Sequence, residues 1–297
     1  MQIMLALFAT VAWGGSSIFA ARGSRATTAL AVTVWSQAIG LVLTLPVLAI
    51  LGADGFTWRE AAHGAVAGTG SGLSLLLLYQ SSRTLYAGVA SALSAATACT
   101  IPVIYTGFRS TTSPQEILGA GVCLVALGAV GTWHRDGVVS APSASPVAAP
   151  AHEATRRRRS PRLGGVSTAI LSGLGMSVYY IALTGTSARG QLRSAFESRM
   201  VATVMLCVIA AATSPPTLRW SRDRTVTGAL VGVTGMAGTL AYAGSVTSGN
   251  LAVIVPLVSL SPAVTIVLAR VFLGEATSRR QTLGLVLAML GVLLVTS

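Results

Sequence analysis

Ten long apolar stretches, separated by short polar breaks, run through the whole chain. They lie at about residues 2–21, 28–51, 62–82, 85–107, 115–133, 164–186, 195–213, 226–247, 250–273 and 281–296. A helix needs roughly 20 apolar residues to cross a hydrocarbon core about 30 Å thick. Such stretches are too long and too continuously apolar for the alternating strands of a membrane barrel. The sequence therefore predicts an all-α membrane protein with ten transmembrane helices.

The composition agrees with a membrane location. Of the 297 residues, 53% are hydrophobic and only 9% are charged, whereas soluble domains carry about a quarter charged residues. The net charge of +12 comes from 20 arginines and no lysine. In a membrane protein such basicity reports topology more often than nucleic-acid binding. We expect a multi-pass protein of the inner cell membrane, surrounded by the lipid bilayer and without a nucleic-acid partner.

An Ala/Pro/Ser-rich, basic linker at residues 134–162 divides the chain into two halves, 1–133 and 163–297, that look related. At sequence offsets of 162 to 164 the matching pairs are Tyr79 with Tyr242, Ser82 with Ser245, Gly64 with Gly228, Gly68 with Gly232 and Ser36 with Ser198. Five spans in each half place the second copy in the bilayer in the opposite sense. We therefore predict two inverted five-helix repeats, an arrangement typical of secondary transporters.

The C-terminal segment carries the most specific motif, which combines a proline in the ninth span, a Leu-Gly-Glu turn and a glycine-spaced tenth span. Its residues are Pro262, Leu273, Gly274, Glu275, Gln281, Gly284 and Gly291. This segment resembles the end of an EamA repeat in the drug/metabolite transporter superfamily. The resemblance implies a secondary transporter that moves a small metabolite or drug-like solute by alternating access, more often as an exporter.

The first half departs from this motif, because Thr112 stands where Glu275 stands in the second half. A carboxylate near a helix N-terminus is favoured by unpaired backbone amides and by the helix dipole. We therefore expect Glu275 to cap a turn rather than to act as a chemical group in transport.

Two prolines, Pro256 and Pro262, interrupt the ninth apolar stretch and predict helix kinks. Ser259 and Ser261 stand near enough in sequence to help satisfy the freed carbonyl groups. The kinked helix would form a bent wall of an internal cavity. A packing kink without ligand contact is the alternative.

The seventh stretch points to charged residues as substrate-binding candidates. Its uncharged part, residues 200–213, is too short to span, so the helix must extend back over Glu197 and Arg199. Charges inside a membrane are costly and are usually functional or paired. Interfacial snorkelling at the start of the helix is the alternative. Trp35 and Gln37 occupy the matching positions in the first half and are candidates as well.

Aromatic and polar side chains in other spans complete the set of substrate-binding candidates. They are Trp13, Ser17, Tyr79, Gln80, Tyr179, Tyr180 and Tyr242. An aromatic ring with a polar tip suits a pocket that must hold a mixed polar and apolar solute. Taken singly, each of these residues also fits helix packing or an interfacial belt.

No catalytic or metal-binding constellation emerges from the sequence. His63, His134 and His152 stand in loops or at span ends, and the acidic residues are scattered. We expect no enzyme activity, no metal and no cofactor, with a small-molecule substrate as the partner. A non-transporting membrane scaffold or a lipid-acting membrane enzyme is the alternative function.

The arginines also bear on orientation in the membrane. The positive-inside rule places the arginine-rich linker in the cytoplasm and both termini outside. The family resemblance favours cytoplasmic termini instead. Both orientations stay open at this point.

Overall fold

The structure is a computed structural model. It describes residues 2–51, 57–107, 114–133, 161–183, 190–213, 219–246, 257–258, 260–275 and 279–296. These residues form ten helices, namely α1 (Gln2–Ala26), α2 (Ala29–Leu51), α3 (Trp58–Ser81), α4 (Ala87–Gly107), α5 (Pro114–Trp133), α7 (Pro161–Leu183), α8 (Gly190–Thr213), α9 (Arg222–Val246), α11 (Ser261–Leu273) and α12 (Arg279–Thr296). The predicted all-α class is confirmed.

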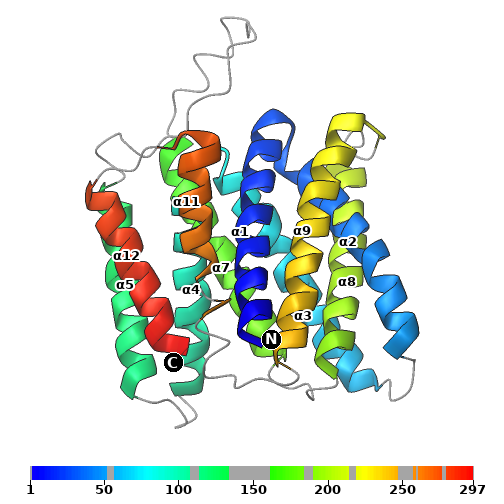
Figure 1. The fold of residues 1–297 in the computed structure, drawn as a ribbon, viewed down its shortest axis with the longest axis horizontal. Coiled ribbons are helices and arrows are strands. Elements are labelled where there is room, and N and C mark those ends of the chain that lie inside the picture. The colour runs from blue at the N-terminus through cyan, green and yellow to red at the C-terminus, as the bar shows by residue number, and fades with distance from the viewer. Residues whose placement is uncertain are drawn as a thin grey trace, which may run out of the picture.

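The helices stand side by side in one bundle (Figure 1). Among the described residues, six helices are long and apolar enough to cross a membrane by length and composition: α1, α2, α3, α7, α8 and α9. Shorter apolar helical segments lie at Ala87–Pro102, Ser261–Leu273 and Thr282–Leu294. The start of α1 and the end of α12 lie at the same end of the bundle (Figure 1). The chain is thus a multi-pass membrane protein by fold and composition.

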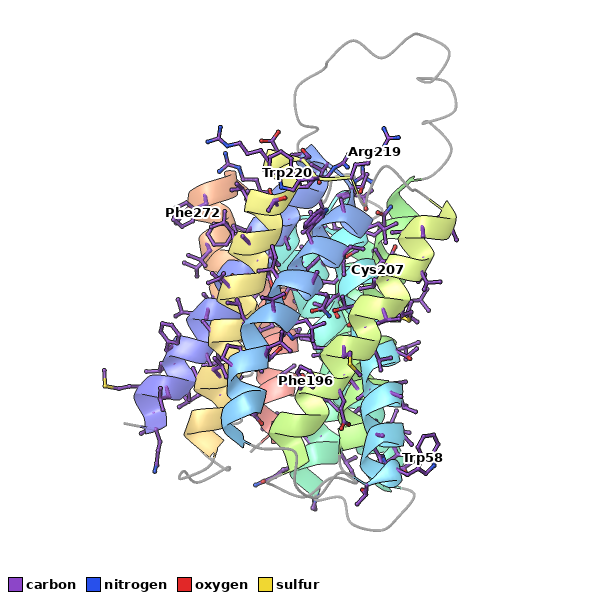
Figure 2. The ribbon with its side chains drawn as sticks, turned by 90° about the vertical axis from the view of Figure 1, so that its right-hand side faces the viewer. Trp58, Phe196, Cys207, Arg219, Trp220 and Phe272 are labelled. Atoms are coloured by element: carbon purple, nitrogen blue, oxygen red, sulfur yellow. The ribbon has the colours of Figure 1, made fainter. Side chains whose placement is uncertain are left out.

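The outer surface of the bundle is apolar and is bordered by tryptophans. Val271 and Phe272 on α11 are 71% and 68% exposed, as expected for side chains that face lipid chains. Trp58 and Trp220 are 84% and 75% exposed, and they lie at opposite ends of the bundle (Figure 2). Because tryptophan is enriched at both membrane interfaces, the two rings mark the lower and upper limits of the lipid-facing region.

Helices of the two sequence halves interleave. From the first half, α1 packs on α9 and α11, α2 packs on α8 and α9, and α3 packs on α7 and α8. At the other side of the bundle, α4 packs on α7 and α11, and α5 packs on α12. The interior is therefore built between the halves rather than inside each one.

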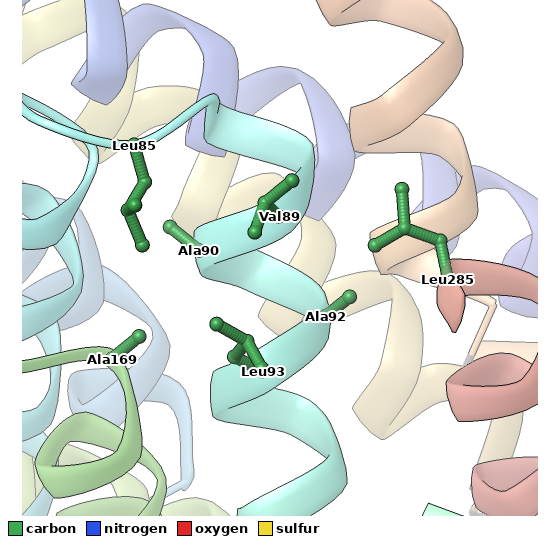
Figure 3. Close-up of a cluster of buried hydrophobic side chains, with 7 residues drawn as sticks. All are labelled: Leu85, Val89, Ala90, Ala92, Leu93, Ala169 and Leu285. Atoms are coloured by element: carbon green, nitrogen blue, oxygen red, sulfur yellow. The ribbon is translucent and has the colours of Figure 1, made fainter. Parts of the chain in front are cut away.

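Small side chains fill much of the interior, which lets the helices approach closely. One buried cluster joins α4 to neighbouring helices (Figure 3). Its residues are Leu85, Val89, Ala90, Ala92, Leu93, Ala169 and Leu285. Buried hydroxyls add polar links between helices, because Ser172 Oγ lies 3.2 Å from Ser74 Oγ and 2.9 Å from Ser94 Oγ.

The ninth stretch corrects the predicted role of Pro262. This proline lies in the first turn of α11, which begins at Ser261, and it does not bend a continuous helix. Proline is well tolerated there because the first-turn amide has no helical acceptor and the fixed φ suits the helix. Leu257 and Val258, which precede it, are also helical. Pro256 lies outside the described residues.

Candidate functional site

Arg199 lies inside the bundle on α8, the helix with the short apolar run. The helix begins at Gly190 and has 24 residues, so it extends back over the charged segment as predicted. The Arg199 guanidinium packs directly against Gly40 of α2, where a β-carbon would overlap with Nη1. A glycine in α2 therefore gives the arginine its place between two helices.

Glu197 occupies a different face of α8. Its side chain is 7% exposed and packs against Gly64 of α3, where a β-carbon would lie 2.8 Å from Glu197 Cβ. Residues two apart on an α-helix point in nearly opposite directions, since each residue turns the helix by about 100°. The two charges predicted from the sequence are both inside the bundle, but they face different neighbours.

Two tyrosines interact with the Arg199 side chain, and a third interacts with one of them. Tyr79 of α3 and Tyr179 of α7 interact electrostatically with Arg199, and Tyr242 of α9 interacts with Tyr179. All three stand near the C-terminal ends of their helices. Because helical side chains tilt toward the helix N-terminus, these rings are directed back toward the middle of the bundle. We call Arg199, Tyr79, Tyr179 and Tyr242 the arginine–tyrosine cluster.

Trp13 of α1 extends the arginine–tyrosine cluster with an aromatic wall. Its ring centroid lies 5.7 Å from that of Tyr242 with a tilt of 43°, and its Nε1 donates to the carbonyl of Gly235 at 3.2 Å. Ser17 donates to the Trp13 carbonyl at 3.1 Å and so stays bonded within its own helix. The indole is thereby held with its polar atom satisfied and its ring packed on Tyr242.

The structure does not bring every predicted residue to this cluster. Gln80 is exposed, and Tyr180 is 43% exposed beside Tyr179, with ring centroids 5.6 Å apart. Trp35 lines a shallow apolar groove of about 270 Å³ on the outer side of α2, together with Ala38, Ile39, Val42 and Leu43. Gln37 is 5% exposed and stands one turn before Gly40 on α2.

Sequence reasoning missed two contributors. Gly40 forms the surface on which Arg199 rests, and Ser16 of α1 interacts with Tyr79 and donates to the Val231 carbonyl at 3.1 Å. A small residue carries no chemical signal of its own, so only the packing of α2 on α8 reveals Gly40. Ser16 could have been found, because it stands three residues after Trp13 on the same helix.

A second charged site lies at one end of the bundle, between helix termini. Arg25 Nη2 lies 2.6 Å from Glu275 Oε1, and Arg25 also donates from Nε to the Ser82 carbonyl at 2.9 Å and from Nη2 to the Leu85 carbonyl at 3.2 Å. Glu275 Oε2 accepts from the backbone N–H of Ala87, the first residue of α4, at 2.8 Å. Glu275 is thus a helix cap, as expected, but it caps α4. We call this arrangement the Arg25–Glu275 latch.

The described residues contain no group of three or more His, Cys, Asp or Glu side chains that could hold a metal ion. What the structure offers instead is a cation inside the bundle with two tyrosines in electrostatic range. Such a site can bind and orient a solute through charge and hydrogen bonds.

Comparison with known proteins identifies the second half. The model of the EamA-like transporter family matches residues 163–297. The predicted resemblance to EamA-type transporters is confirmed there. This EamA-like half supplies Tyr179, Arg199 and Tyr242 of the arginine–tyrosine cluster.

The fold of the whole chain also has a match among solved structures. A chain titled "Crystal structure of protein" aligns with a TM-score of 0.59 and 15% sequence identity, covering 99% of this chain and 95% of that one. At this identity the likeness concerns the fold alone. No curated protein sequence matches the chain. The family match of the second half alone suggests a membrane transporter.

Proposed function

We propose that the chain is a secondary transporter that moves a small metabolite or drug-like solute by alternating access, as an exporter. The observation that carries this proposal is the arginine–tyrosine cluster, because helices from both halves supply it. A site at the junction of two halves becomes accessible from either side as one half rocks against the other. Substrate would shift the balance of the two states by binding them unequally.

Two inverted five-helix repeats, 1–133 and 163–297, joined by the linker 134–162, are part of this proposal. The helix contacts support it, since exchanging the halves turns the α1–α9 contact into α3–α7, and α2–α9 into α3–α8, and all four contacts exist. Close glycine contacts between helices are also related by exchanging the two halves. A β-carbon on Gly68 of α3 would collide with the Ser198 carbonyl of α8, and one on Gly232 of α9 would lie 2.8 Å from the Ser36 carbonyl of α2.

The same proposal places the protein in the inner cell membrane with both termini outside. Arg219 and Trp220 lie at the end of the bundle opposite the chain termini (Figure 2). Arg22, Arg83, Arg222 and Arg270 belong to helix ends or turns at that same end. Because positive charge accumulates on the cytoplasmic side, this end would face the cytoplasm.

Transport by purified protein in liposomes tests the proposal. We expect saturable movement of at least one member of a panel of radiolabelled organic anions, cations, amino acids and nucleosides, absent from protein-free liposomes. Site-specific labelling of single cysteines at the two ends of the bundle should show substrate-dependent accessibility. A panel that yields no transport, with accessibility unchanged by every compound, would favour the non-transporting scaffold.

A further inference from the structure

We infer that the arginine–tyrosine cluster selects solutes that carry one carboxylate on an apolar or aromatic body. This inference rests on the proposed transport function and names the substrate class of the same site. It starts from the charge of Arg199. A guanidinium stays protonated in proteins, so burial cannot remove its charge.

The described carboxylates leave the Arg199 charge without an ion-pair partner. The ion pair within the described residues joins Arg25 to Glu275. Glu197, the nearest acidic residue in sequence, packs on α3 rather than toward α2. A charge in the membrane interior is costly and marks a ligand pathway more often than a packing role. An anionic solute would supply the missing negative charge.

The tyrosines fit the same ligand. The hydroxyls of Tyr79 and Tyr179 lie in electrostatic range of Arg199, and a phenol donates a stronger hydrogen bond to a carboxylate than to a neutral carbonyl. One planar guanidinium with two hydroxyls matches one planar carboxylate. A phosphate dianion would call for more positive charge than this single arginine provides.

The aromatic side chains next to the tyrosines bear on the body of the solute. Trp13 and Tyr242 pack on each other, with ring centroids 5.7 Å apart, and so form one aromatic pair that continues from Tyr179. Such surfaces favour an apolar or aromatic group beside the carboxylate. They would also attract a cation, but Arg199 repels it, so cations are disfavoured at the same position.

The test uses three ligands of nearly equal shape: phenylacetate, phenylacetamide and phenethylamine. Binding to the full-length protein in nanodiscs is measured by ligand-induced thermal stabilisation at neutral pH. We expect phenylacetate to bind roughly 10- to 100-fold more tightly than phenylacetamide, the range of one charged hydrogen-bonded contact. Phenethylamine should bind more weakly than the amide.

Variants distinguish binding at Arg199 from a general effect of the protein's positive charge. Arg199→Gln should abolish the preference for phenylacetate over phenylacetamide, and Arg199→Lys should retain part of it. Arg222→Gln removes the same charge from an exposed position at the start of α9 and should leave the preference intact. Tyr79→Phe, which removes one hydroxyl only, should weaken phenylacetate more than phenylacetamide, because a hydrogen bond to an ionised acceptor is the stronger one.

An equal response to all three ligands, or no response to any, would overturn the carboxylate assignment. So would a preference that survives in Arg199→Gln. These outcomes leave the proposed transport function standing, because the liposome assay scores a panel of several charge classes independently.

Discussion

Arg25, at one end of the bundle, and Arg199, in its interior, differ in what their guanidinium groups contact. Arg25 donates to two carbonyls and to the carboxylate of Glu275. Arg199 meets Gly40 and the electrostatic influence of two tyrosines, and forms no ion pair with the described carboxylates. One cation has its partners built into the fold, whereas the other keeps its capacity to bind a partner.

The difference separates a structural charge from a binding charge. The Arg25–Glu275 latch fastens the end of α1, the turn before α4, and the end of α11 to one another. Removing one partner from such a pair leaves a buried charge uncompensated. Removing Arg199 leaves no described carboxylate without an ion-pair partner, because none of them pairs with Arg199. The two sites should therefore respond to mutation in opposite ways, the first in stability and the second in ligand binding.

Glu275→Ala should cause the largest loss of stability. It leaves Arg25 without its carboxylate and the Ala87 amide without its acceptor, which should lower the free energy of unfolding by about 3–5 kcal/mol. Thermal unfolding of the detergent-solubilised protein measures the change. Arg199→Gln in the same assay should unfold near the wild-type temperature. If the two variants were equally stable, the distinction between the two arginines would be lost.

Arg25→Lys should have the next largest effect on stability. Lysine keeps the charge but cannot reproduce the fork that reaches the Ser82 and Leu85 carbonyls together with Glu275. The loss of one such charged hydrogen bond is worth about 1.5–3 kcal/mol. Denaturant or thermal unfolding of Arg25→Lys beside Arg199→Lys gives the comparison. A smaller loss in Arg25→Lys than in Arg199→Lys would contradict the structural role of the fork.

The sequence predicted the helices better than it predicted the site, and the two arginines show why. Long apolar runs determine spans almost by length alone, so the length needed for a span predicted that α8 includes Glu197 and Arg199. The sequence also pointed to Tyr79, Tyr179 and Tyr242 as aromatics with polar tips. It could not tell these from Tyr180 or Trp35, because which face of a helix points inward depends on the neighbouring helices. The sequence did not predict the ion pair of Arg25, since an arginine at a span end resembles an ordinary interfacial residue.

Two alanine substitutions in adjacent helices, Gly232→Ala and Gly40→Ala, separate an effect on stability from an effect on ligand binding. In Gly232→Ala the new methyl group would lie 2.8 Å from the Ser36 carbonyl and 3.3 Å from the Gly40 amide nitrogen, which are backbone atoms that cannot move aside. Overpacking of this kind costs about 1–3 kcal/mol. In Gly40→Ala the three atoms nearest the methyl group all belong to the Arg199 side chain, whose guanidinium end can rotate away.

Gly40→Ala should therefore fold with nearly wild-type stability and yet bind phenylacetate more weakly, because the guanidinium no longer rests where the tyrosines face it. Gly232→Ala should lose stability, and its preference for phenylacetate over phenylacetamide should persist in the folded fraction. Unfolding temperatures with and without each ligand measure both effects on the same samples. If Gly40→Ala kept full phenylacetate affinity, the packing of Arg199 against Gly40 would have no part in binding. The arginine would then act only through its charge.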